Sequence, residues 1–508
     1  MADWPGLSIG VPRLSNTAYE AACTHYRRID RLQHLQAIAG WDQMANMPPN
    51  GNEARSHALA EVEGLVHEMG TAPALGALLQ RAAAEPLDEA QRASLREMQR
   101  AWRNATAVPQ ELVEAASLAA SRCEHAWRSQ RPANDWQGFS ANLVEVVRLQ
   151  REQARALSAG TELSPYEALL DRFEPGMRCA QIDRYFGDIR GWLPQLIRDA
   201  LRRQESRPAV EPVGPFPKAA QRALGLEAMR MVGFDFEGGR LDESAHPFCG
   251  GVPQDVRMTT RYSEDNFLPA LMGVIHETGH GRYEQNLPRE LLGLPVAQAR
   301  SMGLHESQSL SFEMQLARNP GFVQQLRPLL LKHLGEQAAF EPENLVRLLT
   351  RVRRGYIRVD ADEVTYPAHV ILRYEIERPL INGEIEVSDI PGLWDQGMQE
   401  LLGLDTRGNF RNGCMQDVHW GSGGFGYFPC YTLGAMYAAQ WFAAMRRDLP
   451  DLDGQIARGE LEPIFGWLRE RIWTQGSRWE TDELARRASG ETLNPAHFRR
   501  HLEARYLG

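Results

Sequence analysis

The sequence predicts a mostly α-helical fold with one small β-sheet. Runs rich in Ala, Leu, Glu and Arg fill residues 15 to about 200, and their apolar positions recur every three or four residues, which is the helical period. Only residues 233–266 change character, with alternating and β-branched positions. Proline-containing turns interrupt the helical runs at residues 47–51, 85–86, 108–109, 131–132 and 164–165.

We expect a single unit, because 508 residues with 43% hydrophobic composition can bury a large core. No fixed long period is evident, which favours a helical lobe over a repeat solenoid. The expected regions are a mainly helical lobe at about 1–232, a core at 233–445 that holds the candidate site, and C-terminal helices at 446–508.

Charge and cysteine content narrow the class of protein. The net charge of −10, from 56 basic and 66 acidic residues, shows no basic footprint, so we expect no nucleic-acid partner. The first residues lack a basic segment followed by an apolar one, which predicts no signal peptide. The six cysteines form no C-x-x-C pair or dense framework, so we expect reduced thiols and a cytoplasmic location.

Residues 421–445 carry no charge, which raises the question of a membrane span. Glycines at 421, 423, 424 and 426 argue against a spanning helix. A glycine-rich loop followed by a buried helix from about residue 430 to 445 accounts better for this stretch. We therefore expect no membrane partner.

A small sheet is expected at residues 233–266. Residues 234–240 read as a turn, and residues 252–262 alternate as in a strand or hairpin. The edge of such a sheet can hold a peptide backbone by strand addition. A purely structural hairpin is an equally good interpretation.

A helix predicted from residue 268 onward carries the pattern H-E-x-x-H. His276 and His280 are four residues apart, so they lie on one helix face and can bind the same metal ion. Glu277 then reaches the remaining ligand position, where water sits. A chance match is the alternative, and a further ligand on another segment would argue against it.

A hydrolytic zinc site needs a third protein ligand and an open fourth position. Glu306 follows His280 by 26 positions (306 − 280) and belongs to a second helical pattern that ends near residue 319. This distance allows one loop and an antiparallel return. We predict Glu306 as the third ligand, with His305 as its rival.

At this point the chain resembles the carboxypeptidase Taq family of metallocarboxypeptidases, in which H-E-x-x-H is followed by H-E-S-Q. Further matching motifs lie at residues 41–55, 246–248, 255–259, 357–362 and 413–420. In this family the Glu of H-E-S-Q is a metal ligand, which supports Glu306.

The resemblance implies a helical metallopeptidase with a long deep groove between two lobes, related to neurolysin-like and angiotensin-converting-enzyme-like peptidases. It also implies a homodimer, broad specificity for peptides, and one divalent metal ion per chain, zinc or cobalt. In the family, the region around His246 closes off one end of the groove, so His246 is a candidate for substrate binding.

After the candidate ligands, residues 344–357 and 367–380 read as two helices. Arg358 lies between them and can bind a free peptide carboxylate through two parallel hydrogen bonds. An internal ion pair with Asp360 or Asp362 is the alternative. Arg257 is the competing anchor.

Other candidates follow in the glycine-rich region. A zinc peptidase needs donors for the developing oxyanion, and we predict His419 together with Tyr427 or Tyr431. Carboxylates that could orient the ligand imidazoles are Asp362, Glu363 and Asp417.

The predicted reaction is hydrolysis of the last peptide bond by metal-activated water, with Glu277 as general base. An oligoendopeptidase or a dipeptidyl carboxypeptidase with the same zinc chemistry is the main alternative. A helical scaffold with a structural zinc is the alternative without activity.

Overall fold

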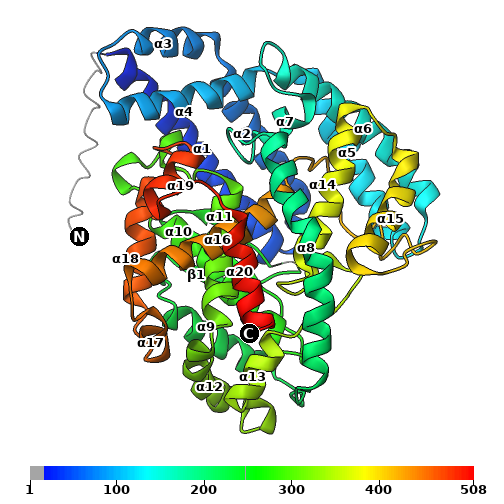
Figure 1. Ribbon diagram of the computed structural model, residues 1–508. Helices are drawn as coiled ribbons and strands as arrows, with labels where there is room; N and C mark the ends of the chain where they lie inside the picture. The colour runs from blue at the N-terminus through cyan, green and yellow to red at the C-terminus, as the bar shows by residue number, and fades with distance from the viewer. Residues whose placement is uncertain (1–16, 246) are drawn as a thin grey trace.

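A computed structural model describes residues 17–245 and 247–508, and it is mostly helical with one three-stranded sheet (Figure 1). This confirms the predicted fold class. The N-terminal helices are α1 (Ala18–Ala45), α2 (Asn52–Thr71), α3 (Pro73–Ala83), α4 (Glu89–Thr106), α5 (Gln110–Gln130), α6 (Trp136–Ser158), α7 (Pro165–Leu170), α8 (Cys179–Glu205) and α9 (Lys218–Met231). The predicted turns fall between these helices, whereas the breaks after α2 and after α7 were not predicted. Asp88 caps α4 by accepting a hydrogen bond from the Gln91 amide at 2.8 Å.

Buried side chains of the N-terminal half belong to three clusters, the smallest of which joins Met229 of α9 to residues of the sheet. Helices α1, α3 and α4 bury Tyr26, Leu79 and Met98 in a cluster of their own. Helices α5 to α8 instead contribute to the main core, which extends to α20 (Pro495–Tyr506). The expected boundaries near residues 232 and 445 stay predictions.

The sheet lies beside the predicted metal helix. Strands β1 (Gly239–Glu243), β2 (Cys249–Val252) and β3 (Asp255–Thr260) are ordered β1-β3-β2, with β1 parallel and β2 antiparallel to β3. The expected turn at 234–240 therefore ends two residues early, because Gly239 pairs with Val256. Since β3 is paired on both sides, only β1 and β2 present an edge for strand addition.

The C-terminal half surrounds three central helices, α10 (Leu268–Gln285), α11 (Met302–Leu310) and α16 (Pro429–Asp448), and a π-helical segment Ser311–Ala317 continues α11. The other helices are α12 (Pro320–Leu334), α13 (Pro342–Leu349), α14 (Tyr366–Asn382), α15 (Ile390–Leu402), α17 (Leu452–Ala457), α18 (Glu462–Arg471) and α19 (Thr481–Ser489). Two glycines permit close crossings in the centre. A Cβ on Gly434 of α16 would lie 2.6 Å from Cγ of Glu306, and a Cβ on Gly279 of α10 would lie 2.5 Å from the Gln308 carbonyl oxygen.

The prediction of a helix over 344–357 was wrong after Leu349, where α13 ends. The side chain of Gln204 holds the following backbone, because it accepts from the Val352 amide at 3.0 Å and donates to the Val352 carbonyl at 2.7 Å. A side chain on a distant helix thus replaces the helical hydrogen bonds of this segment.

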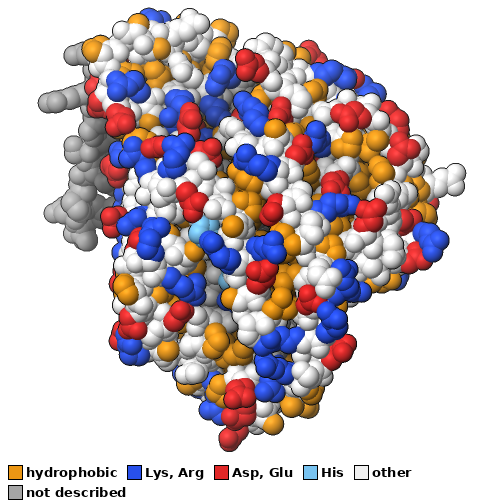
Figure 2. Space-filling view, in the orientation of Figure 1, with side chains coloured by type: hydrophobic (Ala, Val, Ile, Leu, Met, Phe, Trp, Pro, Cys, Tyr) orange, Lys and Arg blue, Asp and Glu red, His pale blue; other side chains and the backbone are white. Residues whose placement is uncertain are grey.

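The uncharged stretch forms a loop and then the buried helix α16, as predicted. Within residues 17–245 and 247–508, no helix is long and apolar enough to cross a membrane. Basic and acidic side chains are interspersed over most of the face in Figure 2.

Candidate metal and substrate site

The three predicted ligands converge. The Nε2 atoms of His276 and His280 lie 4.0 and 3.4 Å from Oε2 of Glu306, and the candidate ligand atoms all lie within 4.8 Å of one another. Ligand atoms of tetrahedral zinc with bonds near 2.1 Å are separated by about 3.4 Å, which is close to the distance between His280 and Glu306 and somewhat shorter than that between His276 and Glu306. Two imidazole nitrogens and a carboxylate oxygen on two helices therefore fit a divalent metal ion.

His276 is oriented from behind by the π-helical segment. Its Nδ1 lies 3.0 Å from Oε2 of Glu313, and Oε1 of Glu313 accepts from Arg318 at 2.8 Å. This contact leaves Nε2 of His276 directed toward Glu306. A carboxylate on the far nitrogen fixes the ring of a metal-binding histidine.

His280 is oriented by His305, the other candidate for the third ligand. Its Nδ1 lies 2.6 Å from Nδ1 of His305, while Nε2 of His305 lies 2.8 Å from Glu284. Because Nε2 of His280 faces Glu306, His305 lies on the opposite side of the ring from the ligand cluster. The structure thus groups Glu306, and not His305, with His276 and His280.

The prediction that Asp362, Glu363 or Asp417 orients the ligand imidazoles was wrong. Asp362 accepts from Thr365, Glu363 accepts from residues of α20, and Asp417 pairs with two arginines. Glu313 was missed. It follows Glu306 by seven residues (313 − 306), a spacing that in a helix predicted from the sequence would place both on the same face.

Glu277 is 9% exposed and stands beside the ligand cluster. Burial raises the pKa of its carboxyl group to about 7; the charge of His276 opposes this and that of Glu306 adds to it. A carboxylate with a pKa near neutrality is well placed to accept and return a proton.

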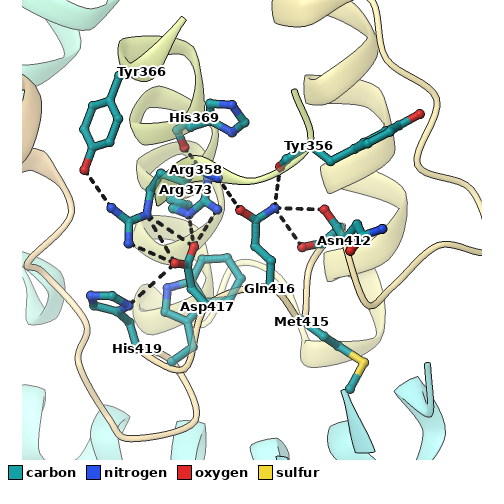
Figure 3. Close-up of polar contacts among 12 residues, drawn as sticks. Tyr356, Arg358, Tyr366, His369, Arg373, Asn412, Met415, Gln416, Asp417 and His419 are labelled. Carbon is teal, nitrogen blue, oxygen red and sulfur yellow. Dashed lines mark hydrogen bonds and ion pairs between the residues drawn. The ribbon is translucent and has the colours of Figure 1, made fainter. Parts of the chain in front are cut away.

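Arg358 belongs to a buried polar network (Figure 3). Its Nη2 donates to Asp417 at 2.9 Å and its Nη1 to the Tyr366 hydroxyl at 2.6 Å, while Nε of Arg373 donates to Asp417 at 2.7 Å. Burial raises the pKa of Asp417, but Arg373 and Arg358 outweigh it and hold that pKa well below its usual range. The internal partner of Arg358 is therefore Asp417, not Asp360 or Asp362, and the network carries one more positive than negative charge.

His419 lies beside this network. Its Nδ1 is 3.9 Å from Asp417, and its ring is 6.3 Å from that of Tyr427, with the two planes 29° apart. Burial lowers the pKa of His419 to about 4, although Asp417 opposes this, so the imidazole is neutral at pH 7.

The two candidate tyrosines lie together on the loop and first turn of α16. Their ring centroids are 5.2 Å apart, and the Tyr431 ring is 4.9 Å from the Arg358 guanidinium. Burial raises the pKa of both hydroxyls, and the charge of Glu306 raises it further. Tyr431 lies one helical turn before Gly434, the residue of α16 that packs against Glu306. Both hydroxyls are protonated donors at neutral pH.

Arg257 lies on β3, where its Nη2 donates to Asp255 at 2.7 Å and its guanidinium lies 4.8 Å from the centre of the Trp41 ring. His246 falls outside the described residues, so its predicted role stays a prediction.

A model of the carboxypeptidase Taq (M32) metallopeptidases matches residues 21–506. The chain belongs to this family. Thermostable carboxypeptidase 1 of Thermus thermophilus is 37% identical to this M32 chain, covering 96% of it and 98% of that protein. Carboxypeptidase 1 of Bacillus subtilis is 33% identical, with 94% and 96% covered.

Solved structures show the same fold. Metallocarboxypeptidase 1 of Trypanosoma cruzi is 45% identical with a TM-score of 0.95, covering 97% of this chain and 99% of that one. A Pyrococcus furiosus carboxypeptidase is 33% identical with a TM-score of 0.92, covering 97% and 99%. The M32 chain is accordingly a metallocarboxypeptidase, an enzyme that depends on a divalent metal, which confirms the predicted family and activity.

Proposed function

We propose that this M32 carboxypeptidase removes C-terminal residues one at a time at a metal centre held by His276, His280 and Glu306. The convergence of these three side chains from α10 and α11 is the observation that carries the proposal. When bound, a divalent metal ion polarises the scissile carbonyl and makes water a stronger nucleophile at neutral pH.

Glu277 is the proposed general base. It takes a proton from the attacking water and passes it to the leaving amine, and its raised pKa suits both transfers. His419 and one of Tyr427 and Tyr431 donate hydrogen bonds to the carbonyl oxygen as negative charge develops there. The neutral state of all three side chains at pH 7 supports this role, because each keeps a proton to donate.

Arg358 is the proposed anchor for the substrate carboxylate. The guanidinium of Arg358 has five N–H groups, and its hydrogen bonds to Asp417 and Tyr366 leave some of them free to donate. Arg358 and Arg373 together carry one more charge than Asp417 neutralises, which favours binding of an anion. The Arg358 guanidinium lies 4.9 Å from the ring of Tyr431, one of the candidate oxyanion donors. Arg257 stays the alternative, although its guanidinium already forms two hydrogen bonds with Asp255.

A peptide and its C-terminally amidated copy test the proposal, with products followed by mass spectrometry. We expect sequential loss of single residues from the free peptide and none from the amide. Equal cleavage of both, or release of dipeptides or internal fragments, would contradict it.

Lysine substitutions distinguish the two anchors. We expect R358K to raise KM for free peptides by more than R257K does, because lysine keeps the charge but loses the paired donors that match a carboxylate. The opposite order would assign Arg257.

Zinc, a homodimer, broad specificity and a cytoplasmic location complete the proposal. The His2Glu donor set supports zinc, with cobalt as the alternative. The six free cysteines support a reducing compartment. The dimer and the broad specificity follow from the family resemblance; metal analysis of the purified protein and light scattering test the metal and the dimer.

A further inference from the structure

Two adjoining cavities lie where α4 meets the segments that precede α11 and α19. Their volumes are about 200 and 420 Å³. The residues that line both are Glu97, Arg100, Pro175 and Arg300. Of the described residues, none of the three candidate metal ligands lines either cavity. Blue side chains gather on this face in Figure 2, over the region between α4 and α19 in Figure 1.

Positive charge exceeds negative charge around these cavities. The six arginines that line them are Arg96, Arg100, Arg103, Arg172, Arg178 and Arg300. The four carboxylates are those of Glu97, Asp171, Glu480 and Asp482. The formal excess is two positive charges, six minus four.

The carboxylates do not neutralise all of the arginines. Glu97 accepts from Arg96 at 2.8 Å and from Arg300 at 2.9 Å. Asp171 lies 3.3 Å from Arg100 and also accepts a backbone amide. Among the described residues, the exposed Arg103, Arg172 and Arg178 form no ion pair with a carboxylate.

Two of the guanidinium groups also have unsatisfied donors. Arg300 is 5% exposed, and its buried Nε finds no hydrogen-bond partner among the described residues; the same holds for Nε of Arg100. Burial lowers the pKa of Arg100, and the neighbouring charge of Arg300 lowers it further against the effect of Asp171. Buried donors are normally paired, so these N–H groups favour an anionic ligand.

We propose that the two cavities bind a phosphate group, held by Arg100 and Arg300 on the inner side and by Arg172 at the rim. Guanidinium groups present paired donors that match phosphate oxygens. A phosphate carries about −1.5 to −2 charge at neutral pH, which matches the excess of two positive charges. The smaller cavity takes the phosphate group, and the larger one adjoining it has room for the remainder of a phosphomonoester.

Binding here would join the N-terminal helices to the helix that carries Glu306. Ser301 and Met302 line the smaller cavity, and the Ser301 hydroxyl caps α11 by accepting from the Leu304 amide at 3.1 Å. A phosphate bound between α4 and this segment stabilises their junction. None of the described residues proposed for the peptidase centre lines these cavities, although Phe173 of the smaller one packs against Tyr427 with ring centroids 5.1 Å apart. The phosphate site does not depend on the proposed mechanism.

Calorimetric titration of the full-length, metal-loaded protein tests the proposal, with orthophosphate, O-phosphoserine and succinate at constant ionic strength. R300K keeps a cation for Glu97 but loses the guanidinium fork, and R172Q removes a side chain that has no ion-pair partner to lose. We expect each to weaken phosphate binding at least about tenfold, because a hydrogen bond to a charged group contributes that much. R28Q, at an exposed position of α1, is the matched control and should bind as the wild type does.

Tighter binding of O-phosphoserine than of orthophosphate supports a phosphomonoester ligand, and the reverse order supports free phosphate. Succinate binding as tight as phosphate binding overturns the assignment. So does the lack of saturable binding by either phosphate compound. If both variants bind phosphate as tightly as the wild type, the phosphate binds elsewhere, for instance at the metal centre, and the proposal is overturned. If R300K does not fold, the result for R172Q alone decides.

Discussion

At the scale of single residues, the imidazole of each proposed metal ligand has an acidic side chain behind it. Glu313 contacts Nδ1 of His276 directly, whereas Glu284 acts on His280 through His305. Both arrangements leave Nε2 of the ligand directed toward Glu306. Because Arg318 also holds Glu313, the side chain of His276 is oriented before any metal binds.

The substitution E277Q tests the general base. We expect kcat to fall at least about 100-fold, because the amide cannot accept the proton of water, while metal content stays unchanged. Zinc analysis by mass spectrometry and single-residue release from a peptide give the two readouts. E290Q, at an exposed position, is the control for the same loss of charge. Turnover by E277Q at the wild-type rate would show that another group is the base.

The substitution E313Q tests the contact behind His276. We expect metal affinity to fall about 10- to 100-fold, because the ring loses the carboxylate that orients it and increases its basicity. Competition with a chelator measures the dissociation constant, and E336Q is the matched exposed control. An unchanged dissociation constant in E313Q would leave Glu313 only as a partner for Arg318.

At the scale of elements, the site depends on how closely α10 and α11 cross. Gly279 lies between the proposed ligands His276 and His280 in α10, and a Cβ there would meet the Gln308 carbonyl oxygen and the Ser309 Cα, both at 2.5 Å. These are backbone atoms of α11, so they cannot move aside without moving the helix that carries Glu306.

We therefore expect G279A to destabilise the protein by about 1–3 kcal/mol and to weaken metal binding, because α11 must shift. The control G273A lies in the same helix, where no atom lies within 4 Å of the added Cβ. It should stabilise the fold by up to about 1 kcal/mol through helix propensity. Chemical denaturation and metal analysis measure both effects; equal behaviour of the two variants would contradict the close-crossing argument.

At the scale of the whole molecule, buried titratable groups make stability depend on pH. His369 of α14 is completely buried. Burial, together with the charges of Arg373 and Arg358, lowers its pKa from 6.5 to about 3. In the unfolded chain His369 thus binds a proton below pH 6.5, whereas in the folded chain it stays neutral until the pH falls to about 3.

The free energy of unfolding should therefore fall as the pH is lowered from 6.5 towards 3, with a contribution from His369 of up to about 1.4 kcal/mol per pH unit. Urea denaturation at a series of pH values measures the slope. H369Q should reduce it by this amount, whereas H57Q, at an exposed position of α2, should leave it unchanged. An identical slope in H369Q and the wild type would show that the pKa of His369 is the same in the folded and unfolded states.

The local pattern of the sequence was enough to predict the mostly helical fold class and the spacing of His276 and His280 on one helix. A four-residue interval places His276 and His280 on one helix face whatever surrounds them, because helix geometry is set within a few residues. The uncharged stretch before residue 445 similarly predicted a buried helix, since burial of so many apolar side chains outweighs the alternatives.

Tertiary structure alone decided which charged groups meet. Asp417 became the partner of Arg358, Glu313 and not Asp362 or Glu363 came to lie behind His276, and Gln204 replaced the helical bonds after Leu349. Each contact joins segments whose separation in space depends on the packing of the whole chain. A charge or amide pairs with whichever partner that packing brings within about 3 Å, and the sequence contains no local signal for that distance.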